Sequence, residues 1–201
     1  MIKNIIFDIG NVLTDFCWQD FLAGKGFDEA MVERIGKAST MGPYWCEYDR
    51  GVWSQEEILQ AFISLDPEIE PEIRKAYESM ENMVVMREYA IPLIERLKEC
   101  GYGVYYLSNY PEKAHKECPE ALAFIPYMHG GILSYRDKLI KPGPEIYKLL
   151  MERYDLKADE CIFLDDTQKN VDGAKAVGMH SILFTTLEKA KEELETFGVT
   201  W

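Results

Sequence analysis

Strand-like and helix-like segments alternate along much of this chain, and this alternation limits its possible folds more than any other feature. Apolar runs typical of buried strands lie at 3–7, 102–107, 131–133, 161–164 and 181–184. Helical patterns separate them, for example at 145–154 and 170–177. Strands that alternate with helices form a parallel sheet with helices on both faces. We therefore predict an α/β fold with a doubly wound, mainly parallel, Rossmann-like sheet.

Residues 15–86 interrupt this alternation. They read as helical throughout, with no strong strand candidate, and a capping box at Ser54-Gln55-Glu56-Glu57 precedes a further apolar helix. We expect a core domain made of residues 1–14 and 87–201, and a helical cap domain over 15–86. An insertion directly after the first strand would cover the carboxyl edge of the sheet, where ligands bind in open α/β folds.

The composition excludes several classes of partner. The net charge is −13, with no cluster of lysine and arginine, so binding to nucleic acid or to an anionic membrane is not expected. No apolar run is long enough to span a bilayer, and the first residues do not fit a secretory signal. Five scattered cysteines without a CxxC motif suggest reduced thiols. We expect a cytoplasmic protein, whose oligomeric state the sequence leaves open.

Polar residues follow the predicted strands at four points. They are Asp8, Ser108-Asn109, Lys141-Pro142 and Asp165-Asp166. Each alone is explained as readily by a turn, a helix cap or a surface lysine. Parallel strands, however, bring their carboxyl ends to one edge of the sheet, so all four groups would meet there. This convergence predicts an active site in which Asp8 is a nucleophile or a metal ligand.

These motifs resemble those of the haloacid dehalogenase superfamily, whose members are mostly phosphatases. The matching segments are Asp8 in Phe-Asp-Ile-Gly-Asn-Val-Leu, Ser108 in Leu-Ser-Asn, Lys141 before Pro142, and Asp165-Asp166 with Asn170, Gly173 and Ala174. A closer likeness is to the subgroup that contains a glucose-1-phosphate phosphatase and the amino-terminal phosphatase of soluble epoxide hydrolases. There, too, an Arg-Gly pair (here Arg50-Gly51) is followed by serine and acidic residues.

The resemblance implies a magnesium-dependent phosphatase of small phosphomonoesters, with sugar phosphates as the expected substrates. It implies Asp8, the Gly10 carbonyl and Asp166 as Mg²⁺ ligands. Asp165 and Asn170 would lie next to these ligands and help to position them. Asp8 would attack phosphorus and form an aspartyl phosphate, with Ser108 and Lys141 as further catalytic residues. Ser108, Asn109 and Lys141 would bind the transferred phosphoryl group. The partner expected is a small phosphorylated metabolite.

One position departs from the family pattern. Most phosphatases of the superfamily place a second aspartate two residues after the nucleophile as general acid, whereas this chain has Gly10. A positioned acid or base contributes roughly 10²–10⁴-fold to the rate. Either Asp15, Glu47 or Asp49 replaces it, or the substrate has a good leaving group, as in a sugar-1-phosphate, an acyl phosphate or an aryl phosphate.

Two other functions are compatible with parts of the pattern. A 2-haloacid dehalogenase of the same superfamily also lacks the second aspartate, but its halide-binding arginine follows the nucleophile closely, and here the first arginine is Arg34. A non-enzymatic phospho-acceptor would resemble receiver domains, which carry their acidic pair at the first strand rather than late in the chain. A catalytically inactive scaffold that binds proteins through the cap is a further alternative.

Overall fold

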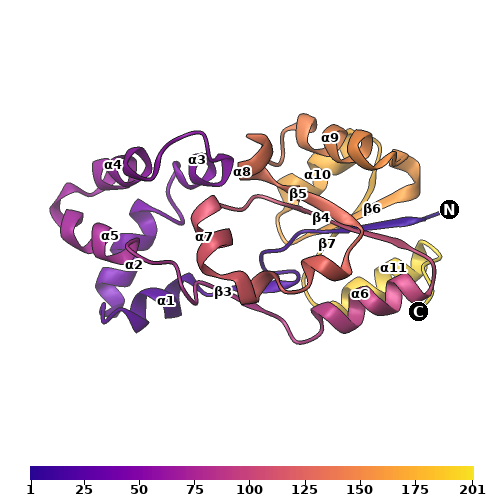
Figure 1. Ribbon diagram of the computed structural model, residues 1–201, viewed down its shortest axis with the longest axis horizontal. Coiled ribbons are helices and arrows are strands. Elements are labelled where there is room, and N and C mark those ends of the chain that lie inside the picture. Colours follow the sequence, from indigo (N-terminus) through magenta and orange to yellow (C-terminus); the bar gives the residue numbers. More distant parts are fainter.

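The computed structural model describes residues 1–201 and contains a five-stranded parallel sheet (Figure 1). Its strands are β1 (Asn4–Phe7), β4 (Gly103–Ser108), β5 (Gly130–Leu133), β6 (Cys161–Asp165) and β7 (His180–Leu183). They lie in the order β5-β4-β1-β6-β7, and every neighbouring pair is parallel. The predicted α/β fold with a parallel sheet is confirmed, and β1 occupies its centre.

Helices cover both faces of the sheet (Figure 1). One face carries α6 (Ala90–Glu99) and α11 (Leu187–Thr196), and the other carries α9 (Pro144–Tyr154) and α10 (Gln168–Ala176). Because successive side chains of a strand point to opposite faces, Ile5 and Phe7 join the hydrophobic cluster of α6 and α11, while Ile6 joins that of α9 and α10. Burial on both faces explains why β1 reads as an uninterrupted apolar run.

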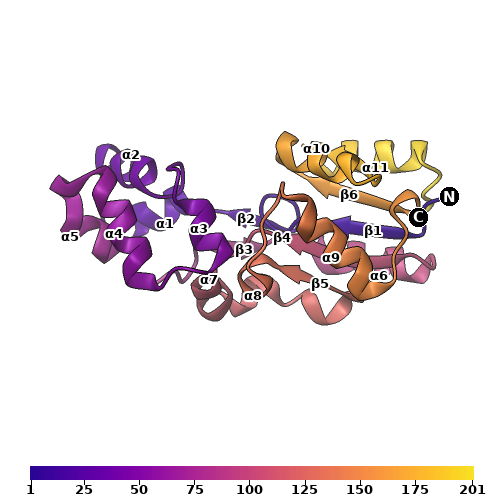
Figure 2. The same cartoon turned by 90° about the horizontal axis from the view of Figure 1, so that it is seen from above.

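A group of five helices lies at the end of the molecule opposite the termini (Figures 1 and 2). They are α1 (Trp18–Gly24), α2 (Glu29–Ala38), α3 (Trp45–Arg50), α4 (Gln55–Leu65) and α5 (Glu70–Ala76). The capping box expected before α4 is present, because the Ser54 and Glu57 side chains each bind the other's backbone amide. None of the helices in the chain combines the length and apolarity that crossing a membrane requires.

The segment 15–86 is not helical throughout, and this part of the sequence-based prediction was wrong. β2 (Thr14–Phe16) and β3 (Val84–Met86) form a two-stranded antiparallel sheet where the chain enters and leaves the helical group. Strands of three residues are too short for a periodic pattern to identify. They pair across the whole insertion, so no local turn signal marks them either. The division into a core domain and a cap domain stays a prediction.

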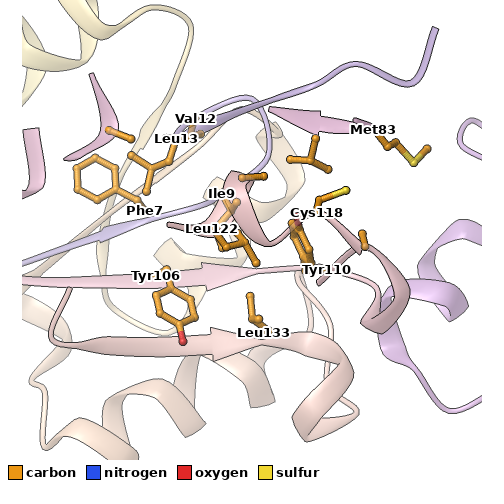
Figure 3. Close-up of a cluster of buried hydrophobic side chains, with 14 of the residues drawn as sticks. Phe7, Ile9, Val12, Leu13, Met83, Tyr106, Tyr110, Cys118, Leu122 and Leu133 are labelled. Atoms are coloured by element: carbon orange, nitrogen blue, oxygen red, sulfur yellow. The ribbon is translucent and has the colours of Figure 1, made fainter. Parts of the chain in front are cut away.

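One continuous apolar cluster connects the sheet to the helical group. The remaining elements of the chain are short: α7 (Glu112–Glu117), α8 (Ser134–Asp137) and the 3₁₀ turns Pro67–Ile69, Pro119–Leu122, Ile125–Tyr127 and Ala158–Glu160. Figure 3 shows Val12 and Leu13, from the loop after β1, beside Phe7, and Ile9 next to Leu122, and all of them belong to one buried apolar cluster. This packing fixes the loop that follows Asp8.

Candidate active site

Asp8 follows β1 directly, and a tightly hydrogen-bonded loop holds it in place. The Ile9 carbonyl accepts hydrogen bonds from the amides of Val12, Leu13 and Thr14 at 3.2, 2.9 and 2.9 Å, and from the Thr14 hydroxyl at 3.0 Å. The Ile9 amide in turn donates to Asp8 Oδ1 at 2.7 Å. These hydrogen bonds fix the loop that carries Asp8, the candidate nucleophile.

A buried lysine joins two of the aspartates. Lys141 Nζ lies 2.8 Å from Asp8 Oδ1 and 2.6 Å from Asp165 Oδ2, and the lysine side chain is 1% exposed. Lys141 does not stand at a strand end, since α8 and a loop separate it from β5. The Asn109 side chain holds it instead, accepting from the Lys141 amide at 2.8 Å and donating to the Lys141 carbonyl at 3.1 Å. Asn109 thus links the end of β4 to the lysine loop.

Asp165, the last residue of β6, has partners for both carboxylate oxygens. Oδ2 accepts from Lys141, Oδ1 accepts from the Thr167 amide at 2.8 Å, and the Asn170 amide group donates to both oxygens at 3.0 and 3.1 Å. Asp165 is fully buried, whereas Asn170 is 6% exposed. These contacts suit a residue that orients Lys141 rather than one that binds a substrate.

Asp166 lies on the open side of the same acidic group. Its Oδ2 accepts from the Asn11 side chain at 3.0 Å, and its Oδ1 accepts from the Thr167 hydroxyl at 3.2 Å. Carboxylate oxygens of Asp8, Asp165 and Asp166 all lie within 4.8 Å of one another. Three carboxylates then face one ammonium group, and Mg²⁺ prefers such oxygen ligands. The residues present therefore fit a hard divalent cation.

Burial dominates the electrostatics of this group. It raises the pKa of Asp8 to about 7, and the charge of Asp165 acts in the same direction, against the lowering effects of Lys141 and of a hydrogen bond from Ser108. Burial by itself lowers the pKa of Lys141, but the neighbouring charges of Asp8 and Asp165 outweigh it, so the net shift is upward. Lys141 therefore stays protonated between the two carboxylates.

A cavity of about 180 Å³ opens over Asp8. Its polar lining consists of Asp8, Gly10, Asn11, Asp49, Asn109, Asp166 and Thr167. Its apolar lining consists of Phe16, Trp45, Met80, Val84, Tyr110, Pro111 and Ala114. Residues from both the sheet edge and the 15–86 segment therefore enclose the space in front of the candidate nucleophile.

The structure brings the predicted site residues together in two layers. Asp8, Gly10, Asn109 and Asp166 line the cavity, whereas Ser108, Lys141, Asp165 and Asn170 are buried around it. Sequence reasoning missed Asn11, which binds Asp166 and also accepts from the Phe16 amide at 3.2 Å. Its signal was the Gly-Asn pair, because asparagine tolerates the left-handed backbone found there, with φ of 56°.

The three carboxylates considered as replacements for the missing acid have different surroundings. Asp15 pairs with Arg87 at 2.7 Å, and Glu47 pairs with Arg50 at 3.1 Å; neither lines the cavity. Asp49 does line it, and Asp49 is only 7% exposed. The structure therefore separates Asp49 from the other two.

Comparison with known proteins gives consistent matches. The model of the haloacid dehalogenase-like hydrolases matches residues 2–178. The sesquiterpene phosphatase astK of Aspergillus oryzae is 25% identical over 183 residues, which are 91% of this chain and 90% of that protein. Bifunctional epoxide hydrolase 2 of Rattus norvegicus is 40% identical over 57 residues, covering 28% of this chain and 10% of that one. Among these curated relatives, the chain spans from 10% to 90% of the relative's own length.

A solved structure resembles this chain over most of the length of both proteins. A HAD family enzyme from Bacteroides thetaiotaomicron, in complex with magnesium and inorganic phosphate, has a TM-score of 0.66 and 23% sequence identity. The match covers 92% of this chain and 95% of that one. At this identity, the likeness establishes a shared fold.

Proposed function

This chain belongs to the haloacid dehalogenase-like hydrolases, and within that family we propose that it is a magnesium-dependent phosphatase of small phosphomonoesters. One observation carries the proposal: Asp8 stands at the base of a cavity, bonded to the buried Lys141, with two further aspartates beside it. Phosphoryl transfer needs this combination of a nucleophile and positive charge, because negative charge is spread over the phosphoryl oxygens in the transition state.

The residues around Asp8 divide the work of the proposed reaction. Asp8 attacks phosphorus through a carboxylate oxygen, the bond from phosphorus to the ester oxygen breaks, and an aspartyl phosphate forms. Water then attacks that phosphorus and releases inorganic phosphate and the Asp8 carboxylate. Lys141 holds Asp8 and neutralises a phosphoryl oxygen, while Ser108 and the Asn109 amide bind the same group. Asp165 and Asn170 keep Lys141 in position.

The proposed metal ligands are Asp8, the Gly10 carbonyl and Asp166. Asp165 is assigned a supporting role because its two oxygens already have protein partners. Mg²⁺ held by these residues would supply positive charge that neutralises the phosphoryl group and the acidic cluster. The structural neighbour solved with magnesium and inorganic phosphate supports magnesium as the cofactor.

The cavity supports a small substrate with a partly apolar alcohol group. On the side formed by residues 15–86, Phe16, Trp45, Met80 and Val84 are apolar, and Asp49 is the one polar lining residue. The phosphatase relative named for a sesquiterpene substrate agrees with an apolar leaving group. A sugar phosphate is the alternative that the sequence predicts. We propose that the substrate, of either kind, is a cytoplasmic metabolite.

Phosphate release tests the proposal directly. The purified chain would be assayed with Mg²⁺ against aryl, alkyl and sugar phosphates, beside an Asp8→Asn variant whose side chain is the same size but cannot act as the nucleophile. We expect release that EDTA abolishes, that added Mg²⁺ restores, and that the variant lacks. Halide release from a 2-haloacid that persists in EDTA, without phosphate release, would favour the dehalogenase alternative instead.

A further inference from the structure

We propose that Asp49 is the general acid and base of this phosphatase and replaces the aspartate that most family members have at the position of Gly10. This inference rests on the function proposed above. Its carboxyl group belongs to α3, outside the sheet, yet it lines the same cavity as Asp8. It is buried and has neither a hydrogen-bond partner nor an ion pair within the protein. Its oxygens are not among the fully enclosed polar atoms that lack a partner, so they open onto the cavity, where a bound ligand can reach them.

The backbone of Asp49 is fixed to the sheet side of the cavity. Ser134, a fully buried residue at the start of α8, donates to the Asp49 carbonyl at 2.5 Å. The same hydroxyl accepts from the Tyr110 amide at 2.9 Å, just beyond β4. Lys138 donates to the carbonyl of Gly51. Asp49 is therefore held against the edge of the sheet from which Asp8 projects.

Gly51 makes this close approach possible. It ends α3 in the left-handed conformation, with φ of 67°, and a Cβ atom there would lie 2.8 Å from the Tyr135 Cβ. No larger residue fits that gap without moving α3 away from α8. The Arg50-Gly51 pair singled out in the sequence thus acquires a physical role, which is to let Asp49 reach the cavity.

The environment of Asp49 favours its protonated form. Burial is the main cause and raises its pKa well above the ordinary range for aspartate, with the charge of Asp8 adding to the effect. Lys141 and Lys169 act in the opposite direction but are outweighed. A neutral carboxyl group is what a general acid needs before the reaction begins.

The proton balance closes over the two steps. As Asp8 attacks and the bond from phosphorus to the ester oxygen breaks, the Asp49 carboxyl group gives its proton to the departing oxygen, which leaves as an alcohol. The Asp49 carboxylate then accepts a proton from the water that attacks the aspartyl phosphate. Inorganic phosphate leaves, Asp8 returns to a carboxylate and Asp49 is again protonated. Substrates with poor leaving groups then become accessible despite Gly10.

Leaving-group dependence separates this role from a structural one. With enzyme in excess and Mg²⁺ present, the consumption of propyl phosphate and of p-nitrophenyl phosphate would be followed by rapid quench. We expect Asp49→Asn to slow propyl phosphate about 10²–10⁴-fold and p-nitrophenyl phosphate no more than about tenfold, because p-nitrophenolate leaves without a proton. The matched control is Glu47→Gln on the same helix, which should slow neither substrate.

A second variant provides a rescue. A Cβ atom at Gly10 would meet nothing within 4 Å, so Gly10→Asp can place a carboxyl group beside Asp8. In the Asp49→Asn background it should restore at least part of the propyl phosphate rate. Equal slowing of both substrates by Asp49→Asn, or slowing of neither, would overturn the role of Asp49 while leaving the phosphatase proposal intact. A wild-type chain that consumes neither substrate would overturn both.

Discussion

The tight contact between α3 and α8 predicts a large and measurable effect of Gly51→Ala. Alanine in the left-handed conformation costs about 1–2 kcal/mol. Its Cβ atom would also approach the Tyr135 Cβ to 2.8 Å, and such crowding typically costs a further ~1–3 kcal/mol. We therefore expect the free energy of unfolding to fall by about 2–5 kcal/mol, measured by urea denaturation followed by circular dichroism.

Gly101→Ala is the matched control for this variant. Gly101 has φ of 88°, also left-handed, but a Cβ atom there would meet nothing within 4 Å. Gly101→Ala should therefore lower the free energy of unfolding only by the conformational cost of alanine, about 1–2 kcal/mol. The difference between the two variants isolates the contact with α8. A loss for Gly51→Ala no larger than that for Gly101→Ala would refute the close docking of α3.

Gly51→Ala should also change the kinetics. If α3 moves away from α8, Asp49 moves with it, and a displacement of about 1 Å can cost about 10²-fold in rate. Turnover of an alkyl phosphate should therefore fall more in Gly51→Ala than turnover of p-nitrophenyl phosphate, whereas Gly101→Ala should leave both unchanged. Equal losses of turnover on the two substrates would show that the docking of α3 does not act through proton transfer by Asp49.

Two further variants test the buried network. Lys141→Met leaves Asp8 and Asp165 without their cation, so we expect a loss of about 3–5 kcal/mol in the free energy of unfolding together with loss of phosphate release; unchanged stability would refute the buried pairing. Tyr154→Phe removes a hydroxyl that donates to the Gly131 carbonyl at 3.1 Å and accepts from its amide at 2.8 Å, so urea denaturation should show a loss of about 1–3 kcal/mol with kcat unchanged.

The sheet and the acidic cluster could be predicted because their signals are local. The apolar runs end at polar residues, and parallel pairing carries Asp8 and Asp165 to one edge. Lys141 fits this reasoning less well, since its position depends on a clamp by Asn109 across 32 residues of chain rather than on a strand end. Identifying Lys141 required the family resemblance as well as the pattern.

The contacts of the inserted segment could not be predicted from pattern alone. β2 and β3 pair across the whole insertion, and neither is long enough to show a period. Asp15, Glu47 and Asp49 looked equivalent in the sequence. Only the contact of α3 with α8, which joins Asp49 to Ser134 across 85 residues, turns one of the three into the cavity. Such long-range contacts leave no periodic or compositional signal.

Chemical trapping of Asp8 tests the central claim most directly. The chain would be mixed with Mg²⁺ and p-nitrophenyl phosphate, quenched in acid during turnover, reduced with borohydride and mapped by mass spectrometry. An aspartyl phosphate is reduced to homoserine, whereas a free carboxyl group is not, so homoserine at position 8 is the result predicted. Aspartate retained at position 8 in a chain that is releasing phosphate, with another residue modified or none, would contradict the account.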